Sequence, residues 1–199
     1  MADPIILASS SEIRATLLRN AGVPFTTEKP RVDEEMIRAS LEAEEASPRD
    51  IADFLAEAKA RKVSLKANGA LVIGCDQVLD FDGTVMSKPA DPSECLAQLT
   101  ALRGKTHRLL SAAVIYKDGE PLWRHVGVVR LTMREFSDDY LSDYVVRNWE
   151  SVRWSVGGYK LEEEGVRLMS RIEGDYFNVL GLPMIELLNY LTVRGALPA

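Results

Sequence analysis

A carboxylate and a lysine near the middle of the chain have the residue types and spacing to do chemistry together. The apolar run at residues 70–75 (A-L-V-I-G-C) is typical of a buried strand, and it ends at Asp76. Ligands of α/β proteins tend to bind where strands end, which favours Asp76 as a ligand-facing group. Asp82-Gly83 is typical of a tight turn. Such a turn would make a hairpin that brings Lys88 opposite Asp76.

The serine-rich segment near the N-terminus is a second candidate site. The apolar residues 4–8 predict a short strand, and Ser9 and Glu12 then have the spacing of a capping box that would start a helix. A helix that begins after a strand offers free N–H groups to an anion, and Ser9, Ser11 and Arg14 could add donors. A capped helix with a surface arginine explains the same residues, and Glu12 would compete with an anion for the helix dipole.

Two further features could contribute charge to a site. Glu34 lies in an acidic cluster at residues 33–35, and clustered carboxylates suit hard cations such as Mg²⁺. A solvated surface is the commoner explanation of such a cluster. Lys59 adjoins the apolar stripe of a helix expected from Pro48 onward, where it could either extend its ammonium group to solvent or contact a phosphate.

Composition excludes several classes of protein. The 199 residues carry a net charge of -6, which argues against binding to nucleic acid polymers. We find no apolar run of transmembrane length and no signal peptide, and we therefore expect a cytoplasmic protein without membrane contact. Cys75 and Cys95 lack metal-binding spacing, and His107 and His125 are the only histidines, so we expect reduced thiols and no zinc site.

The remaining patterns mix helices with hairpin strands. Residues 109–117 and 122–134 are expected to be strands joined at Asp118-Gly119, Ser137 is expected to cap a helix, and Pro183 is expected to open the last one. No repeat or linker divides the chain. We therefore expect one α/β domain over residues 1–199 that is not a regular doubly wound sheet.

The stretch L-D-F-D-G-T-V at residues 79–85 resembles the nucleophile loop of haloacid-dehalogenase-like phosphatases. That resemblance would make Asp80 the nucleophile and Asp82 the acid/base. However, Asp76 and Gln77 interrupt the strand that should lead to Asp80, and some 75 residues precede the loop. This phosphatase remains an alternative, although Asp80 and Asp82 are more simply interpreted as residues at the hairpin tip.

A second resemblance covers nearly the whole chain in the expected order. The sequence resembles the Maf family, septum-formation-inhibitor-like proteins that act as nucleoside triphosphate pyrophosphatases. The matching segments are L-A-S-S-S-E-I-R-A-T-L-L (7–18), V-D-E (32–34), A-K-A (58–60), I-G-C-D-Q-V (73–78), D-G to K-P (82–89), L-R-G-K-T-H (102–107), G-G-Y (157–159) and G-D-Y-F-N-V-L-G-L-P (174–183). The resemblance implies a two-lobed α/β domain around a mixed, curved sheet, with a nucleotide in the cleft between the lobes.

The resemblance also implies roles for individual residues. Asp76 would be the general base that activates water, and Glu34 and Asp76 would hold a divalent metal, Mg²⁺ or Mn²⁺. The triphosphate would be bound by Ser9, Ser11, Arg14, Lys59 and Lys88. The products would be a nucleoside monophosphate and pyrophosphate. Such a division of labour suits phosphoryl chemistry, which depends on positioning and on neutralisation of charge.

Departures from the commonest family pattern concern the choice of base. Ile13 stands where arginine or tryptophan is typical, and Gln77 and Glu162 resemble the branch similar to 7-methyl-GTP pyrophosphatases. We expect a modified or non-canonical nucleotide such as 7-methyl-GTP, with the dTTP/UTP branch as an alternative. A non-catalytic nucleotide-binding regulator of septum formation is a third alternative. A homodimer is left open by the sequence.

Overall fold

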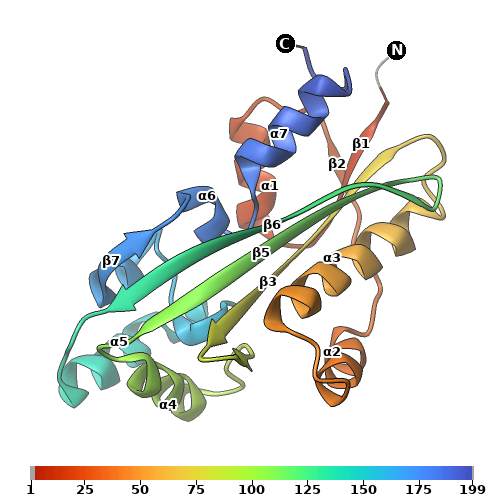
Figure 1. The fold of residues 1–199 in the computed structure, drawn as a ribbon. Helices are drawn as coiled ribbons and strands as arrows, with labels where there is room; N and C mark the ends of the chain where they lie inside the picture. Colours follow the sequence, from red (N-terminus) through yellow and green to blue (C-terminus); the bar gives the residue numbers. More distant parts are fainter. Residues whose placement is uncertain (1–2, 199) are drawn as a thin grey trace.

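A single mixed sheet runs through residues 3–198, the part of the chain that the computed structural model describes (Figure 1). Its strands follow the order β2-β1-β3-β5-β6-β7, and β4 pairs with β3. β1 is parallel to β2 and β3, whereas every other strand pair is antiparallel. The strands are β1 (Ile5–Ala8), β2 (Thr26–Thr27), β3 (Leu71–Phe81), β4 (Thr84–Met86), β5 (Thr106–Lys117), β6 (Glu120–Met133) and β7 (Met169–Glu173).

Helices cover both faces of this sheet (Figure 1). One face packs against α3, with α2 beside it, whereas the other carries α1 and α7 at one end and α4 and α5 at the other. The helices are α1 (Glu12–Asn20), α2 (Glu34–Ala43), α3 (Pro48–Ser64), α4 (Pro92–Leu102), α5 (Asp138–Val152), α6 (Tyr176–Val179) and α7 (Met184–Val193), with 3₁₀ turns η1 (Val156–Gly158) and η2 (Glu164–Leu168). The expected α/β architecture with a mixed sheet flanked by helices is confirmed.

A polar row divides the apolar core on the second face into two clusters. Side chains on a strand alternate between faces, and Gln77 of β3 lies between Cys75, in the cluster under α1 and α7, and Leu79, in the cluster under α4 and α5. On β5 the corresponding residue is Ser111, which is paired with Gln77. This row separates the two lobes, and its Gln77 end opens into a cleft.

Close packing of α3 on β3 sets the position of Lys59. A Cβ atom on Gly74 would lie 2.2 Å from the backbone oxygen of Ala56 and 2.5 Å from the backbone nitrogen of Ala60, so only glycine permits this approach. Lys59 precedes Ala60 on the helix, and Asp76 lies two residues beyond Gly74 on the same face of the strand. The glycine thereby brings the lysine within reach of the carboxylate.

The hairpin after β3 forms where the sequence predicted it, but its pairing is shorter. Asp82 (φ 53°) and Gly83 (φ 86°) make the turn, and both have the left-handed backbone that tight hairpins need. The ladder with β4 reaches only from Phe81 to Leu79. The expectation that Lys88 faces Asp76 across paired strands was therefore wrong, because Lys88 lies beyond the end of β4.

Within residues 3–198, no helix has the length and apolar character that crossing a membrane requires.

Candidate active site

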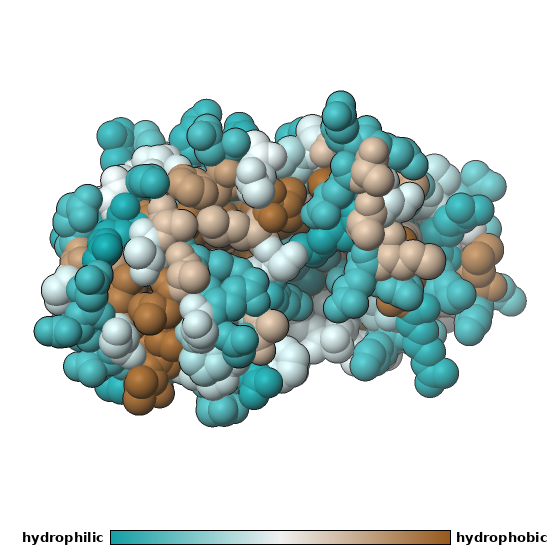
Figure 2. Space-filling view, turned by 90° about the horizontal axis from the view of Figure 1, so that it is seen from below, coloured by the Kyte–Doolittle hydropathy of each residue, from teal (hydrophilic) through white to brown (hydrophobic). Residues whose placement is uncertain are grey.

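A cleft of about 1000 Å³ opens beside the middle of β3. β1 pairs with β3 only as far as Gly74, and β4 pairs with it only from Leu79 onward, so in the described chain residues 75–78 have no strand neighbour on this edge. Figure 2 shows the hollow, walled mainly by hydrophilic residues, between two parts of the surface. Its volume is at the upper end of the range for small-molecule sites, enough for a nucleotide.

All ten residues that the sequence singled out for a site line this cleft. Nine come from the first ninety residues and one from the segment after η1. They are Ser9, Ser11, Ile13, Arg14, Glu34, Lys59, Asp76, Gln77, Lys88 and Glu162. The structure therefore brings together residues that are more than 150 positions apart in sequence.

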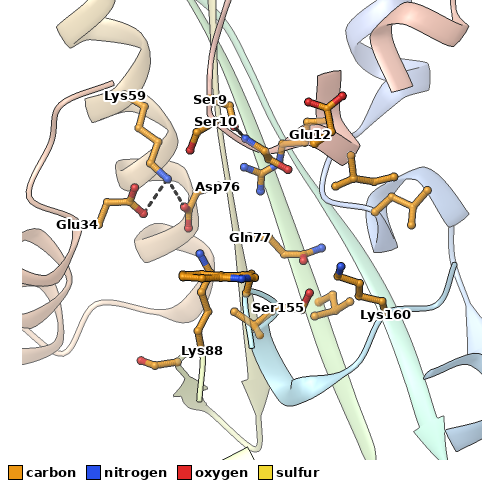
Figure 3. Close-up of a pocket in the computed structure, with 18 of the residues that line it drawn as sticks. Ser9, Ser10, Glu12, Glu34, Lys59, Asp76, Gln77, Lys88, Ser155 and Lys160 are labelled. Carbon is orange, nitrogen blue, oxygen red and sulfur yellow. Dashed lines mark hydrogen bonds and ion pairs between the residues drawn. The ribbon is translucent and has the colours of Figure 1, made fainter. Parts of the chain in front are cut away.

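A buried lysine joins two carboxylates at the centre of the cleft (Figure 3). The Nζ atom of Lys59 lies 2.6 Å from Oδ1 of Asp76 and 2.9 Å from Oε2 of Glu34. Lys59 exposes only 6% of its surface, and so does Asp76. The alternative in which Lys59 extends to solvent was wrong, because its ammonium group is enclosed and paired.

The charges of this group reinforce one another. Burial opposes the charged form of Lys59, but Asp76 and Glu34 outweigh it and raise the pKa of Lys59 above its ordinary value. Burial likewise opposes ionisation of Glu34, but Lys59 outweighs it and lowers the pKa of this carboxyl group. Lys59 and Glu34 are therefore both charged at neutral pH.

Lys88 supplies a second cation to the same space (Figure 3). Its side chain remains open to solvent, yet desolvation by the cleft walls lowers its pKa, and the neighbouring positive charges of Lys59 and Arg14 lower it further. Three cationic side chains thus surround one opening in a chain whose overall charge is negative. Such a local cluster can attract an anionic ligand.

The turn formed by Ser9, Ser10 and Ser11 (the serine turn) also lines the cleft, but it does not form the expected capping box. The helix α1 begins at Glu12 with Ser11 as N-cap, and within the described chain neither serine hydroxyl caps it. Instead Oγ of Ser9 accepts a hydrogen bond from the backbone N–H of Ser11 at 3.1 Å. Glu12 is turned away to Arg19, at 2.5 Å. The first N–H groups of α1 therefore remain available at the cleft.

Arg14 is fixed by two backbone carbonyl groups. Its Nε donates to the oxygen of Gly181 at 2.8 Å, and Nη1 donates to the oxygen of Cys75 at 3.3 Å. The first bond spans 167 residues, and glycine at 181 favours it, because the backbone there is left-handed (φ 94°) and a Cβ would lie 3.1 Å from Nε. Part of the guanidinium fork is thus occupied by the protein, and Nη2 is the nitrogen best placed for a ligand.

The amide of Gln77 is oriented by three acceptors around its nitrogen. Nε2 lies 2.9 Å from Oγ of Ser111, 2.9 Å from the oxygen of Asn178 and 3.1 Å from the oxygen of Val179. Only the NH₂ end can satisfy these oxygens, so the carbonyl end Oε1 must point the other way. Gln77 therefore offers a ligand an acceptor.

One part of the cleft lining, the apolar wall, consists of nonpolar and aromatic side chains. Its residues come from β5, from the segment around η1, and from α6 and the residue after it: Leu109, Trp154, Val156, Tyr159, Leu161, Val179 and Leu180. Ile13 and Glu162 border this wall. The sequence had not singled out Trp154 as a site residue, because it belongs to none of the matching motifs. Lys160, which also lines the cleft, was missed as well.

Asp80, the nucleophile of the phosphatase alternative, does not line the cleft. It is not a hairpin-tip residue either, since it lies in β3 paired with Val85 and exposes only 1% of its surface. Oδ1 accepts a hydrogen bond from the N–H of Gly83 at 2.9 Å, and Oδ2 contacts Arg108. Its oxygens are thus held by the hairpin and by β5.

The donor set of the cleft is compatible with a hard cation. Oδ2 of Asp76 is buried and finds no hydrogen-bond partner within residues 3–198. A second carboxylate, Glu34, is paired with the same lysine, Lys59. No cluster of three or more His, Cys, Asp or Glu side chains with metal-binding geometry occurs in the same range. Mg²⁺ commonly uses one or two protein carboxylates and takes its remaining ligands from water and substrate phosphates.

Comparison with known proteins gives consistent matches over the full length. The model of the family "Maf-like protein" matches residues 4–194. A nucleoside triphosphate pyrophosphatase of Roseobacter denitrificans is 66% identical over 198 residues, covering 100% of both chains. Namesakes from Ruegeria sp. and Caulobacter vibrioides are 67% and 52% identical, and each alignment covers 98% of this chain and at least 97% of the other.

Among solved structures, a dITP/XTP pyrophosphatase of Mycobacterium abscessus overlaps with a TM-score of 0.36. It is 19% identical, and the overlap covers 65% of this chain and 72% of that one. A likeness at that level supports no inference about the site.

Proposed function

The chain belongs to the Maf-like protein family, and on that premise we propose that it hydrolyses nucleoside triphosphates to a nucleoside monophosphate and pyrophosphate. It would be a hydrolase that acts on phosphoric anhydrides. One observation carries the proposal: Asp76 is a buried carboxylate with an oxygen that has no hydrogen-bond partner within residues 3–198, and it lines a nucleotide-sized cleft together with Lys59 and Lys88. That arrangement places a proton acceptor close to positive charges that can neutralise a polyphosphate.

Asp76 is proposed as the general base. Oδ1 is engaged by Lys59, which leaves Oδ2 to accept a proton from water as its oxygen forms a bond to phosphorus. The bond that breaks joins the α-phosphorus to the bridging oxygen, and pyrophosphate leaves with that electron pair. A positioned base of this kind contributes about 10²- to 10⁴-fold to a rate.

Cations and N–H groups are proposed to hold the triphosphate. Lys59, Lys88 and Nη2 of Arg14 would neutralise its charge, and Ser9 and Ser11 at the start of α1 would donate hydrogen bonds. Because Arg14 and Lys59 are already fixed by protein contacts, little reorganisation would be needed when the substrate binds. Preorganised charge is the main means by which proteins stabilise phosphoryl transfer.

Glu34 and Asp76 are proposed as the protein ligands of Mg²⁺ or Mn²⁺. A bound divalent cation would neutralise phosphate charge and lower the pKa of a coordinated water. Two carboxylates that share one lysine already tolerate a positive charge between them. Substrate oxygens and water would complete the coordination.

Two acceptors near the apolar wall favour a base with adjacent donors. Gln77 presents Oε1, and Glu162 adds an exposed carboxylate beside Lys160. A guanine edge carries neighbouring N–H donors, whereas uracil and thymine flank one N–H with two carbonyl oxygens that would meet these acceptors unfavourably. A carboxylate also suits a cationic, methylated base. We therefore propose a guanine nucleotide such as 7-methyl-GTP ahead of dTTP or UTP.

A nucleotide panel with product identification tests these proposals. The purified protein should release pyrophosphate from a triphosphate in the presence of Mg²⁺ or Mn²⁺, with 7-methyl-GTP hydrolysed fastest. Orthophosphate as the product would instead support a phosphatase, and neither product a binding protein. The base assignment fails if dTTP or UTP is hydrolysed at least as fast as 7-methyl-GTP.

A further inference from the structure

Trp154 leaves most of its indole ring in contact with solvent. It exposes 68% of its surface, although tryptophan carries a large apolar ring that proteins usually bury. Trp149, five residues earlier, packs against the core cluster under α4 and α5. Trp154 follows the end of α5, and its side chain lines the cleft. The ring therefore faces the site where a ligand is expected.

A cation supports this ring. The guanidinium group of Arg153 lies 5.1 Å from the ring centroid of Trp154 and 5.3 Å from that of Trp149, within range of a cation–π contact with both. Nη1 of Arg153 also lies 3.6 Å from Glu150 on α5. Trp149 is anchored in the core, so it holds Trp154 in place through Arg153. The exposed ring is thus braced by its neighbours.

The position of the ring within the cleft suggests its partner. The lysines and the serine turn line the cleft, and so does Trp154 with the nonpolar or aromatic residues Val156, Tyr159 and Leu161 of the segment that follows it. A nucleotide whose phosphates bind to the cations would present its base to this apolar part of the lining. Resting on the function proposed above, we propose that Trp154 is the platform on which the nucleobase stacks.

Stacking makes a prediction about the choice of base. Every nucleobase has a π-face, so an aromatic platform accepts all of them, but a purine covers more of an indole ring than a pyrimidine does. A cationic base gains further from the negative face of the indole. The affinity contributed by Trp154 should therefore fall from 7-methylguanine to guanine to uracil.

Binding measurements with two probes separate the base from the phosphates. The first probe is a GTP analogue with a methylene group in place of the α–β bridging oxygen, and the second is inorganic tripolyphosphate, both titrated calorimetrically without added metal. Trp154→Ala should weaken binding of the analogue about 5- to 150-fold and leave binding of tripolyphosphate unchanged. Trp154→Phe should keep most of the affinity. Val146→Ala, which removes an exposed apolar side chain away from the cleft lining, is the matched control and should change neither.

Three results would overturn the assignment. The analogue could bind Trp154→Ala within twofold of the wild-type affinity. Both probes could weaken equally, which would indicate a role in folding or in phosphate binding. Sedimentation could show that Trp154→Ala dissociates a dimer without loss of nucleotide affinity, which would assign the ring to a subunit contact. Failure of the proposed function has a different signature, since wild-type protein would then release no pyrophosphate from any triphosphate whatever the binding data show.

Discussion

Two aspartates four residues apart on β3 share the same face of the strand but have opposite surroundings. Asp76 and Asp80 are both nearly inaccessible to solvent, at 6% and 1% exposure. Asp80 is enclosed by its own hairpin and by Arg108, whereas Asp76 sits where β3 lacks a strand neighbour on one edge in the described chain. One oxygen of Asp76 is bound by Lys59, and the other finds no partner within residues 3–198.

The difference shows that burial alone does not identify a reactive carboxylate. A buried polar group normally has its hydrogen bonds completed by the protein. Oδ1 of Asp80 accepts a hydrogen bond from Gly83, and Oδ2, which accepts no hydrogen bond within residues 3–198, forms an ion pair with Arg108. At Asp76 the protein supplies a positive charge through Lys59, and Oδ2 is left able to bond to a ligand in the cleft. The two carboxylates thus differ in what lies beside their second oxygen, a cleft at Asp76 and Arg108 at Asp80, and the first arrangement is the one expected of a reactive group.

The largest effect should come from replacing the carboxylate that faces the cleft. Asp76→Asn keeps the shape and one acceptor, but an amide cannot take a proton from water. We expect the rate of pyrophosphate release to fall about 10³-fold, in line with the loss of a positioned general base. Steady-state kinetics with the best substrate of the panel measures it.

The fold of Asp76→Asn should be checked independently by its circular dichroism spectrum and its melting temperature. A variant that retains more than a tenth of wild-type activity while properly folded would remove Asp76 from the chemistry.

A somewhat smaller loss is expected from removing the cation between the carboxylates. Lys59→Met keeps the apolar stem of the side chain and deletes the charge shared by Glu34 and Asp76. Activity should fall about 10²- to 10³-fold, as for other preorganised charges. The free energy of unfolding should also fall, because breaking a buried ion pair leaves an uncompensated charge.

Added Mg²⁺ sharpens this prediction. If Glu34 and Asp76 bind the cation, Mg²⁺ should raise the melting temperature of Lys59→Met more than that of Lys59→Arg, in which a positive charge remains between the carboxylates. Equal shifts in the two variants would argue against the proposed metal ligands.

Local sequence patterns predicted the strand that leads to Asp76, the Asp82-Gly83 turn and the helix that carries Lys59. They did not predict the helix that begins at Glu34, and β3 continues past Asp76, where the apolar run ends, to Phe81. Apolar runs, turn dipeptides and helical spacing are properties of neighbouring residues, so they can be interpreted without the fold. The family resemblance then placed ten residues in one cleft. The capping box failed because Ser9 bonds to its own turn, a choice between two local geometries that spacing does not distinguish.

Contacts between distant segments could not be predicted in this way. Arg108 reaches Asp80 because of the register between β5 and β3, and Arg14 is held by Gly181 at the opposite end of the chain. The extent of the β4 ladder, which decided where Lys88 lies, is also a product of the whole sheet. Trp154 was missed for a different reason, since it lies outside the motifs that carry the family resemblance.

His107 is buried on β5, the strand that pairs with β3 near Asp80. Its protonation predicts how the stability of this enclosed end of the sheet depends on pH. Burial lowers the pKa of His107 to about 4 from its ordinary 6.5, and its Nε2 lies 2.7 Å from the hydroxyl of Tyr159. The folded protein binds the proton more weakly than the unfolded chain does. The stability contributed by neutral His107 is therefore complete above pH 6.5 and lost as the pH falls toward 4, by up to about 3 kcal/mol.

Urea unfolding at a series of pH values measures this loss. His107→Gln cannot take up the proton but can still bond to Tyr159, so its free energy of unfolding should decline less steeply between pH 6.5 and 4 than that of the wild type. Curves of equal slope would show that His107 is not what makes this end of the sheet sensitive to acid.

The smallest effect is expected at Asp80, and it completes the contrast with Asp76. In Asp80→Asn the amide oxygen can still accept the hydrogen bond from Gly83, and only the charge that pairs with Arg108 is lost. Because Arg108 is nearly half exposed, water and salt already screen that pair, and the free energy of unfolding should fall by about 1 kcal/mol or less. The rate of pyrophosphate release should stay within twofold of wild type, measured beside Asp76→Asn under the same conditions. A properly folded Asp80→Asn variant that lost activity as Asp76→Asn is expected to do would make the enclosed carboxylate the reactive one, and incomplete bonding toward a cleft would no longer distinguish the two.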